Sequence, residues 1–113
     1  MRNEYGILLD HNGYIPSIIQ DDSSYCWRCG KHGSTERHEP FGNALRDKSK
    51  ALGMWLPLCR ECHRTAPDSA HKSRGTADAM RQATQQAAML TYGWTMDEWM
   101  RRFYKNYWED YKE

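Results

Sequence analysis

Apolar residues recur at helical spacing in the last third of the chain and predict two helices there. Between about residues 76 and 91 they stand three or four positions apart, and Gly93 follows as a C-terminal stop. Thr95 and Glu98 then have the spacing of a capping box, which predicts the start of a second helix. The residues expected to face the core are Met80, Ala83, Ala87 and Leu90 in the first helix, and Met96, Trp99, Met100, Phe103 and Tyr107 in the second.

Before residue 76 the pattern changes and predicts short strands. Residues 36–40 are expected to be extended, and residues 54–58 form an apolar strand. A connection with a helical turn over residues 41–53 joins them. The second strand leads into a short helix that Pro67 ends within two turns. The order of strand, connection, strand and helix makes a ββα unit.

Near the start of the chain, residues 5–16 read as two short extended segments around an Asn-Gly turn. They are expected to lead into the ββα unit. No internal repeat or low-complexity linker divides the 113 residues, so we predict one α+β domain with three parts. These are lead-in strands over 1–22, a metal-binding ββα module over 23–75, and a helical cap over 76–113.

All four cysteines lie in two C-x2-C pairs, Cys26 with Cys29 and Cys59 with Cys62. Two intervening residues allow a tight turn to point both sulfurs at one ion, and two such turns supply the four ligands of a tetrahedral zinc site. The alternatives are two disulfides or free buried thiols. Met1 is followed by no basic and apolar segment of the signal-peptide type, so an oxidising compartment is not indicated. We therefore predict a structural Zn²⁺, which would replace the large core that this module is too short to form.

Charge is distributed unevenly, although the net charge is only +1. Residues 1–22 carry −3, residues 23–75 carry +5 and residues 76–113 carry −1. The excess of basic side chains therefore lies in the same part of the chain as the predicted metal ligands. There it would suit a phosphate-bearing partner. The simpler alternative is an ordinary solvated surface. The residues that we expect to contact nucleic acid are Arg37, Arg46, Lys48, Arg60 and Arg64. No apolar run approaches the roughly 18 residues of a membrane span, so no membrane partner is expected.

Histidines stand close to both cysteine pairs and point to a second metal position. His38 lies between the pairs and His63 directly follows Cys62. A ββα unit would bring the end of its first strand against its short helix, and so would place these two side chains together. An open site of this kind differs from a closed four-cysteine site because it leaves room for water or substrate.

Taken together, these motifs resemble the zinc-bearing HNH endonucleases, whose ββα-metal fold hydrolyses DNA. The resemblance is closest to a phage and prophage subgroup that includes recombination-enhancing nucleases, and it covers about residues 17–75. It rests on the cysteine pairs and on segments that occur in the same order as in that subgroup, namely Glu36-Arg37-His38-Glu39, Phe41-Gly42, Arg46-Asp47-Lys48-Ser49, Gly53-Met54, Leu58-Cys59 and His71. The resemblance implies DNA as substrate, a phage or host recombination protein as a possible partner, and the cytoplasm of a bacterial host cell as the location.

The resemblance also implies roles for single residues. His38, His63 and His71 would bind a catalytic divalent metal ion, Mg²⁺, Mn²⁺ or Zn²⁺, and Glu39 would be the general base. An alternative register makes His38 the base and Glu39 a ligand or an orienting group. The middle asparagine of the HNH pattern is replaced by Met54, and Asn43 could take its place only if the connection folds back.

Two other functions remain open at this point. The same zinc fold could be inactive and bind DNA or a protein through its basic half. Alternatively, the aromatic C-terminal helix could be a partner surface in an interaction protein, with Trp108 and Tyr111 exposed. His63 could also complete the structural zinc site in place of a cysteine, and His38 could be an ordinary surface residue.

Overall fold

A computed structural model describes residues 1–111 and shows an α+β protein, as predicted. Two short strands, β1 (Glu36–His38) and β2 (Leu56–Leu58), form an antiparallel sheet in which Glu36 pairs with Leu58 and His38 with Leu56. The connection between them holds η1 (Asn43–Leu45) and α1 (Arg46–Ala51), and β2 leads directly into η2 (Glu61–Thr65). The strand, connection, strand and helix order therefore matches the predicted ββα unit.

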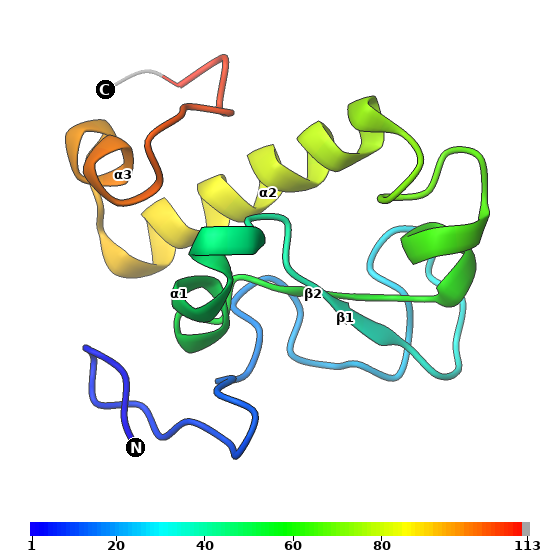
Figure 1. Ribbon diagram of the computed structural model, residues 1–113, viewed down its shortest axis with the longest axis horizontal. Helices are drawn as coiled ribbons and strands as arrows, with labels where there is room; N and C mark the ends of the chain where they lie inside the picture. The colour runs from blue at the N-terminus through cyan, green and yellow to red at the C-terminus, as the bar shows by residue number, and fades with distance from the viewer. Residues whose placement is uncertain (112–113) are drawn as a thin grey trace.

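The two C-terminal helices are α2 (Arg74–Tyr92) and α3 (Met96–Phe103). The Ser73 and Thr95 side chains cap them by accepting hydrogen bonds from the backbone N–H groups of Thr76 and Glu98. Figure 1 shows α2 crossing the molecule, with α3 at one end and the cysteine-bearing loops, cyan and green, toward the other. No helix within residues 1–111 is both long and apolar enough to span a membrane.

The buried face of α2 differs from the predicted one. Its core residues are Met80, Thr84, Gln85, Ala88 and Met89, whereas Leu90 is 77% exposed and Ala83 and Ala87 are only half-buried. Met80 is buried as predicted, but the rest of the predicted face was wrong because two polar residues, Thr84 and Gln85, occupy the core side. Gln85 is hydrogen-bonded there at both ends of its amide, since the nitrogen donates to Asn106 Oδ1 at 2.8 Å and the oxygen accepts from the Tyr107 N–H at 2.7 Å.

An aromatic core packs α2 and α3 against Phe41, Leu52 and Met54, which flank α1. Trp99 and Phe103 are buried as predicted, and their rings stack with centroids 4.5 Å apart. Met100 is 37% exposed, and α3 ends at Phe103, so Tyr107 packs against Phe41 from the following segment rather than from the helix. Trp108 and Tyr111 are partly buried beside the same core.

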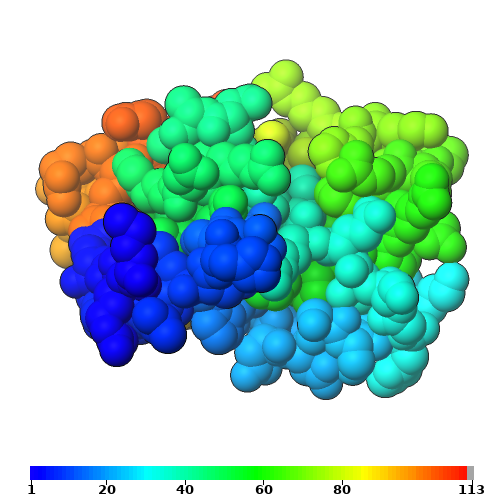
Figure 2. All heavy atoms as spheres, turned by 60° about the horizontal axis from the view of Figure 1, so that its bottom comes forward, coloured from blue at the N-terminus to red at the C-terminus, as the bar shows by residue number. Residues whose placement is uncertain are grey.

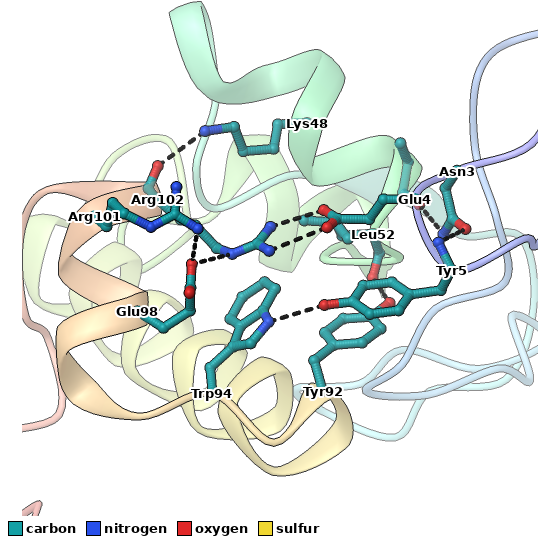
Figure 3. A network of polar contacts seen from close by, with 11 residues as sticks. Asn3, Glu4, Tyr5, Lys48, Leu52, Tyr92, Trp94, Glu98, Arg101 and Arg102 are labelled. Carbon is teal, nitrogen blue, oxygen red and sulfur yellow. Dashed lines mark hydrogen bonds and ion pairs between the residues drawn. The ribbon is translucent and has the colours of Figure 1, made fainter.

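The N-terminal segment contains no regular strand within residues 1–22, contrary to expectation. Only an isolated bridge joins Arg2 to Leu8, although the predicted Asn-Gly turn forms, with the Gly13 N–H donating to the Asp10 carbonyl at 3.0 Å. Polar contacts anchor the segment instead. The Asn3 amide donates to the Ala51 carbonyl. The Glu4 carboxylate pairs with Arg102 at 2.7 Å (Figure 3). Figure 2 shows the segment, in blue, lying along the green and orange atoms of the α1 and α3 regions.

Candidate metal centres

The four cysteine sulfurs converge on one point. All lie within 4.8 Å of one another, and the sulfurs of Cys29 and Cys59 are 3.7 Å apart. Zinc–sulfur bonds of about 2.3 Å in a tetrahedron require sulfur separations of about 3.8 Å, whereas a disulfide needs about 2.05 Å. All four cysteines are free thiols, so the arrangement fits a closed zinc site better than the disulfide alternative.

Local backbone hydrogen bonds create this convergence. In the first pair, the Gly30 N–H donates to the Cys26 carbonyl at 2.9 Å and closes a tight turn. The Trp27 N–H donates to the carbonyl of Pro57 in β2 at 2.8 Å, which fixes that turn beside the sheet. In the second pair, the His63 N–H donates to the Cys59 carbonyl at 2.9 Å as η2 begins.

The thiols differ in how readily they ionise. Burial raises the pKa of Cys62 to about 12. Burial also opposes ionisation of Cys26, but backbone hydrogen bonds to its sulfur from Cys29, Cys59 and Arg28 outweigh it and lower its pKa to about 7. Zinc binds the thiolate form, so loading this site releases protons and its affinity rises with pH.

A second cluster contains the three predicted histidines. One ring nitrogen from each of His38, His63 and His71 lies within 4.8 Å of the others, and the Nε2 atoms of His63 and His71 are 3.0 Å apart. The ring centroids are separated by 4.7 to 5.5 Å. His63 belongs to this group and not to the four-cysteine group, so the structure does not support its role as a ligand of the structural zinc.

Three separate elements supply these rings. His38 ends β1, and His63 lies on η2, a single wide turn closed by the Ala66 N–H on the Glu61 carbonyl at 3.0 Å. The chain then folds back, because the His71 N–H donates to the His63 carbonyl at 3.1 Å. Consecutive residues on η2 face different directions, so Cys62 joins the sulfur cluster while His63 joins the histidine cluster.

Glu36 orients His63 and was not predicted as a site residue. Its Oε1 lies 2.8 Å from His63 Nδ1, and this hydrogen bond lowers the pKa of Glu36. A proton on Nδ1 leaves the Nε2 lone pair free for a cation, as in many metal sites where a carboxylate holds the ligating histidine. The sequence did hold a signal for Glu36. It stands two positions before His38 on a strand, so the two side chains lie on the same face of the sheet.

Two of the three histidines are held in the neutral form at physiological pH. Burial, together with the nearby His63 and His71 rings and the Arg81 guanidinium, lowers the pKa of His38 to about 3. Burial and His63 also lower the pKa of His71. These side chains thus offer neutral imidazoles, the form that binds metal ions.

A cleft of about 230 Å³ opens beside the histidine cluster. Of the predicted nucleic-acid contacts, Arg37, Arg46 and Arg64 line it. The other two are elsewhere: Lys48 donates to the carbonyl of Arg102 at 3.0 Å, and Arg60 is exposed but does not line the cleft.

Glu39 lines this cleft but lies outside the group of converging histidine nitrogens. Its side chain is 7% exposed, and its carboxylate accepts a hydrogen bond from Arg46 Nε at 2.8 Å. Asn43 also lines the cleft, so the connection does fold back, whereas Met54 is fully buried in the aromatic core.

Comparisons with protein-family models, curated proteins and solved structures give no match for this chain. The inference of function therefore rests on the two centres and the cleft. The four-cysteine cluster can hold a structural zinc ion. The histidine cluster can hold a second cation with coordination positions left for other ligands, in a cleft lined by arginines that suit an anion.

Proposed function

We propose that this protein is a metal-dependent DNA endonuclease or nickase of the HNH type, which hydrolyses phosphodiester bonds. The observation that carries the proposal is the convergence of His38, His63 and His71 at an arginine-lined cleft. The neighbouring four-cysteine cluster supports it, because a separate structural zinc would leave the histidines free for chemistry.

The chain's own side chains would divide the work in the following way. His38, His63 and His71 would hold a divalent cation, which supplies charge neutralisation for the phosphodiester and activation of water. Arg37 and Arg64 would bind the phosphates of the strand. A ring nitrogen of His38 lies among the converging histidine nitrogens, which supports His38 as a metal ligand. Glu39, which lines the same cleft, would then accept the proton from water.

Nicking of a supercoiled plasmid tests this function. Zinc-loaded protein is incubated with Mg²⁺, Mn²⁺, added Zn²⁺ or no further metal, and open circles are expected only with a divalent cation. His38→Ala should lower the nicking rate at least about 10²-fold, the size expected when a catalytic ligand or base is lost. His11→Ala, which changes an exposed histidine in the N-terminal turn, is the matched control.

Glu39→Gln distinguishes the two assignments of the general base, Glu39 or His38. Near-complete loss of nicking would support Glu39 as the base, and a mild loss would return that role to His38. If the wild-type protein binds DNA with a strong salt dependence but never nicks it, the nuclease proposal fails and an inactive DNA-binding zinc module takes its place.

A further inference from the structure

A second cleft adjoins the first at His71. It has a volume of about 520 Å³ and is formed by the loop before α2 and the first turns of that helix. Its basic residues are Lys72, Arg74 and Arg81, and Tyr107 lines it as well. Because His71 lines both clefts, a ligand in the first could extend past the histidine cluster into the second.

The charge of the second cleft favours an anion. Three cations face one carboxylate, Asp78, which pairs with Arg81 at 2.7 Å and with Arg74 at 3.7 Å. Lys72 is exposed, and its ammonium donates to the Thr65 carbonyl at 3.2 Å, without a carboxylate partner in the described part of the chain. The cleft thus keeps a net charge of about +2.

Arg81 connects this cleft to the segment that follows His38. Its Nε donates to the carbonyl of Pro40 at 3.2 Å, two residues beyond His38, and its Nη1 pairs with Asp78. A guanidinium has five N–H donors, so donors remain for a bound anion. Its side chain is 31% exposed, which leaves the group accessible from the cleft.

We propose that the DNA strand cut at the histidine cluster continues into this second cleft, where Lys72 and Arg81 each hold one of the phosphates that follow the scissile one. The inference rests on the proposed nuclease function and extends it. It makes the helical cap part of the substrate site, because α2 supplies Arg81. The proposed substrate is a strand with phosphates on both sides of His71, so a lone phosphodiester would not fill the site.

Equilibrium binding tests the inference independently of cleavage. A fluorescently labelled single-stranded DNA 12-mer is titrated with zinc-loaded protein, without a catalytic metal, over a series of NaCl concentrations, and binding is followed by anisotropy. In the double variant Lys72→Ala, Arg81→Gln, the slope of log K against log salt should fall by about 1.4, since each phosphate contact on a single strand contributes about 0.7. The matched control is Arg2→Ala, Arg101→Ala, which removes two exposed cations outside both clefts and should leave the slope unchanged.

Single variants guard against unfolding. Lys72→Ala removes an exposed side chain and should lower the slope by about 0.7 with zinc content and melting temperature unchanged. Arg81→Lys retains the charge and should restore most of the slope lost in Arg81→Gln, with zinc content and melting temperature unchanged in both variants.

The outcomes separate the two proposals. If the variants bind DNA with the wild-type slope while the wild-type protein nicks plasmid, the second cleft does not bind the strand and the nuclease proposal stands. If the slopes fall as expected but no metal produces nicks, the second cleft stands as a DNA-binding site only and the nuclease proposal fails. If the wild-type protein binds no DNA, the proposed role of the second cleft in DNA binding is wrong.

Discussion

The hydrogen bond between Glu36 and His63 is a small contact with a large expected effect on metal binding. It fixes which nitrogen of a ring that is 3% exposed carries the proton. A glutamine at position 36 could still make a hydrogen bond but would lose the negative charge that makes the imidazole a better ligand. The residue therefore acts through His63 and not on substrate.

Glu36→Gln should lower the affinity of the histidine cluster for a divalent cation by roughly 10- to 100-fold, the range found for such supporting carboxylates. Calorimetric titration of zinc-loaded protein with Mn²⁺ or Co²⁺ measures this directly. Glu109→Gln is the matched control, because that exposed carboxylate lies far along the chain from the cysteines and histidines and does not line the cleft. Equal losses in the two variants would show that the Glu36 contact does not support the metal site.

The cysteine cluster could be predicted from sequence because its signal is local. Cysteines with two residues between them can share one tight turn, and His63 is adjacent to Cys62. The partners of single side chains could not be predicted in this way. Whether Arg46 binds a phosphate or the Glu39 carboxylate depends on how the connection folds back, which a pattern of residue types does not encode.

At the scale of elements, the turn after α1 is the tightest constraint. Gly53 has φ +70°, and a Cβ there would lie 2.6 Å from the Pro16 carbonyl oxygen and 3.2 Å from the Ile15 side chain. Gly93, which ends α2, has nearly the same φ of +68°, but a Cβ added there would meet no atom within 4 Å. The two glycines thus share one backbone requirement and differ in the space around them.

Alanine at these two positions should separate strain from steric overlap. Gly93→Ala should cost about 1–2 kcal/mol of unfolding free energy, the penalty of a left-handed conformation. Gly53→Ala should cost about 1–3 kcal/mol more, because the new methyl group must displace backbone. Urea denaturation of both variants measures the difference. Equal costs would mean that the 15–18 segment moves aside freely.

Elements were easier to predict than their faces. Gly93 and the Thr95 cap correctly placed the end of α2 and the start of α3, because caps are local signals. The buried face of α2 was wrong because the core there includes Gln85, which is stabilised by partners more than 20 positions away in sequence. Hydrophobic periodicity cannot detect a buried polar residue of this kind.

At the scale of the whole molecule, the ion pair between Glu4 and Arg102 joins the N-terminal segment to α3. Arg102 lowers the pKa of Glu4 from its ordinary value of 4.5, chiefly through their hydrogen bond. The pair therefore stabilises the fold at pH values above that range, and the stabilisation is lost as the pH falls through the lower folded-state pKa. Glu4 is about half exposed, so the effect should be below about 1 kcal/mol.

Glu4→Gln should lower the melting temperature at pH 7 by a few degrees and should make the acid-side loss of stability less steep between about pH 5 and 3. Thermal unfolding at a series of pH values measures both effects. Glu109→Gln, on an exposed carboxylate of the C-terminal segment, is the control. Parallel pH profiles for wild type and Glu4→Gln would contradict the assignment.

Two cores of different character divide the molecule. The aromatic one includes Phe41, Trp94, Trp99 and Phe103, whereas the other combines Cys26, Cys59 and Cys62 with Leu56, Leu58, Ala70 and Met80. Structural zinc contributes about 10–16 kcal/mol of apparent binding free energy in small domains, as much as the roughly 5–15 kcal/mol of a typical fold. The cysteine side should therefore depend on the metal far more than the aromatic side does.

Cys59→Ser should release zinc and unfold much of residues 23–75, whereas α3 and the adjoining turns of α2 should stay ordered around Trp99. The histidine cluster should be lost with the zinc, because η2 carries both Cys62 and His63. His63→Ala, in contrast, should keep the structural zinc. Metal analysis and hydrogen exchange test this: amides near Cys26 and Cys62 should exchange rapidly in Cys59→Ser while that of Phe103 stays protected. Less than about half an equivalent of zinc in pure, folded wild-type protein would exclude the four-cysteine zinc site, and uniform exchange would show that the two cores unfold as one.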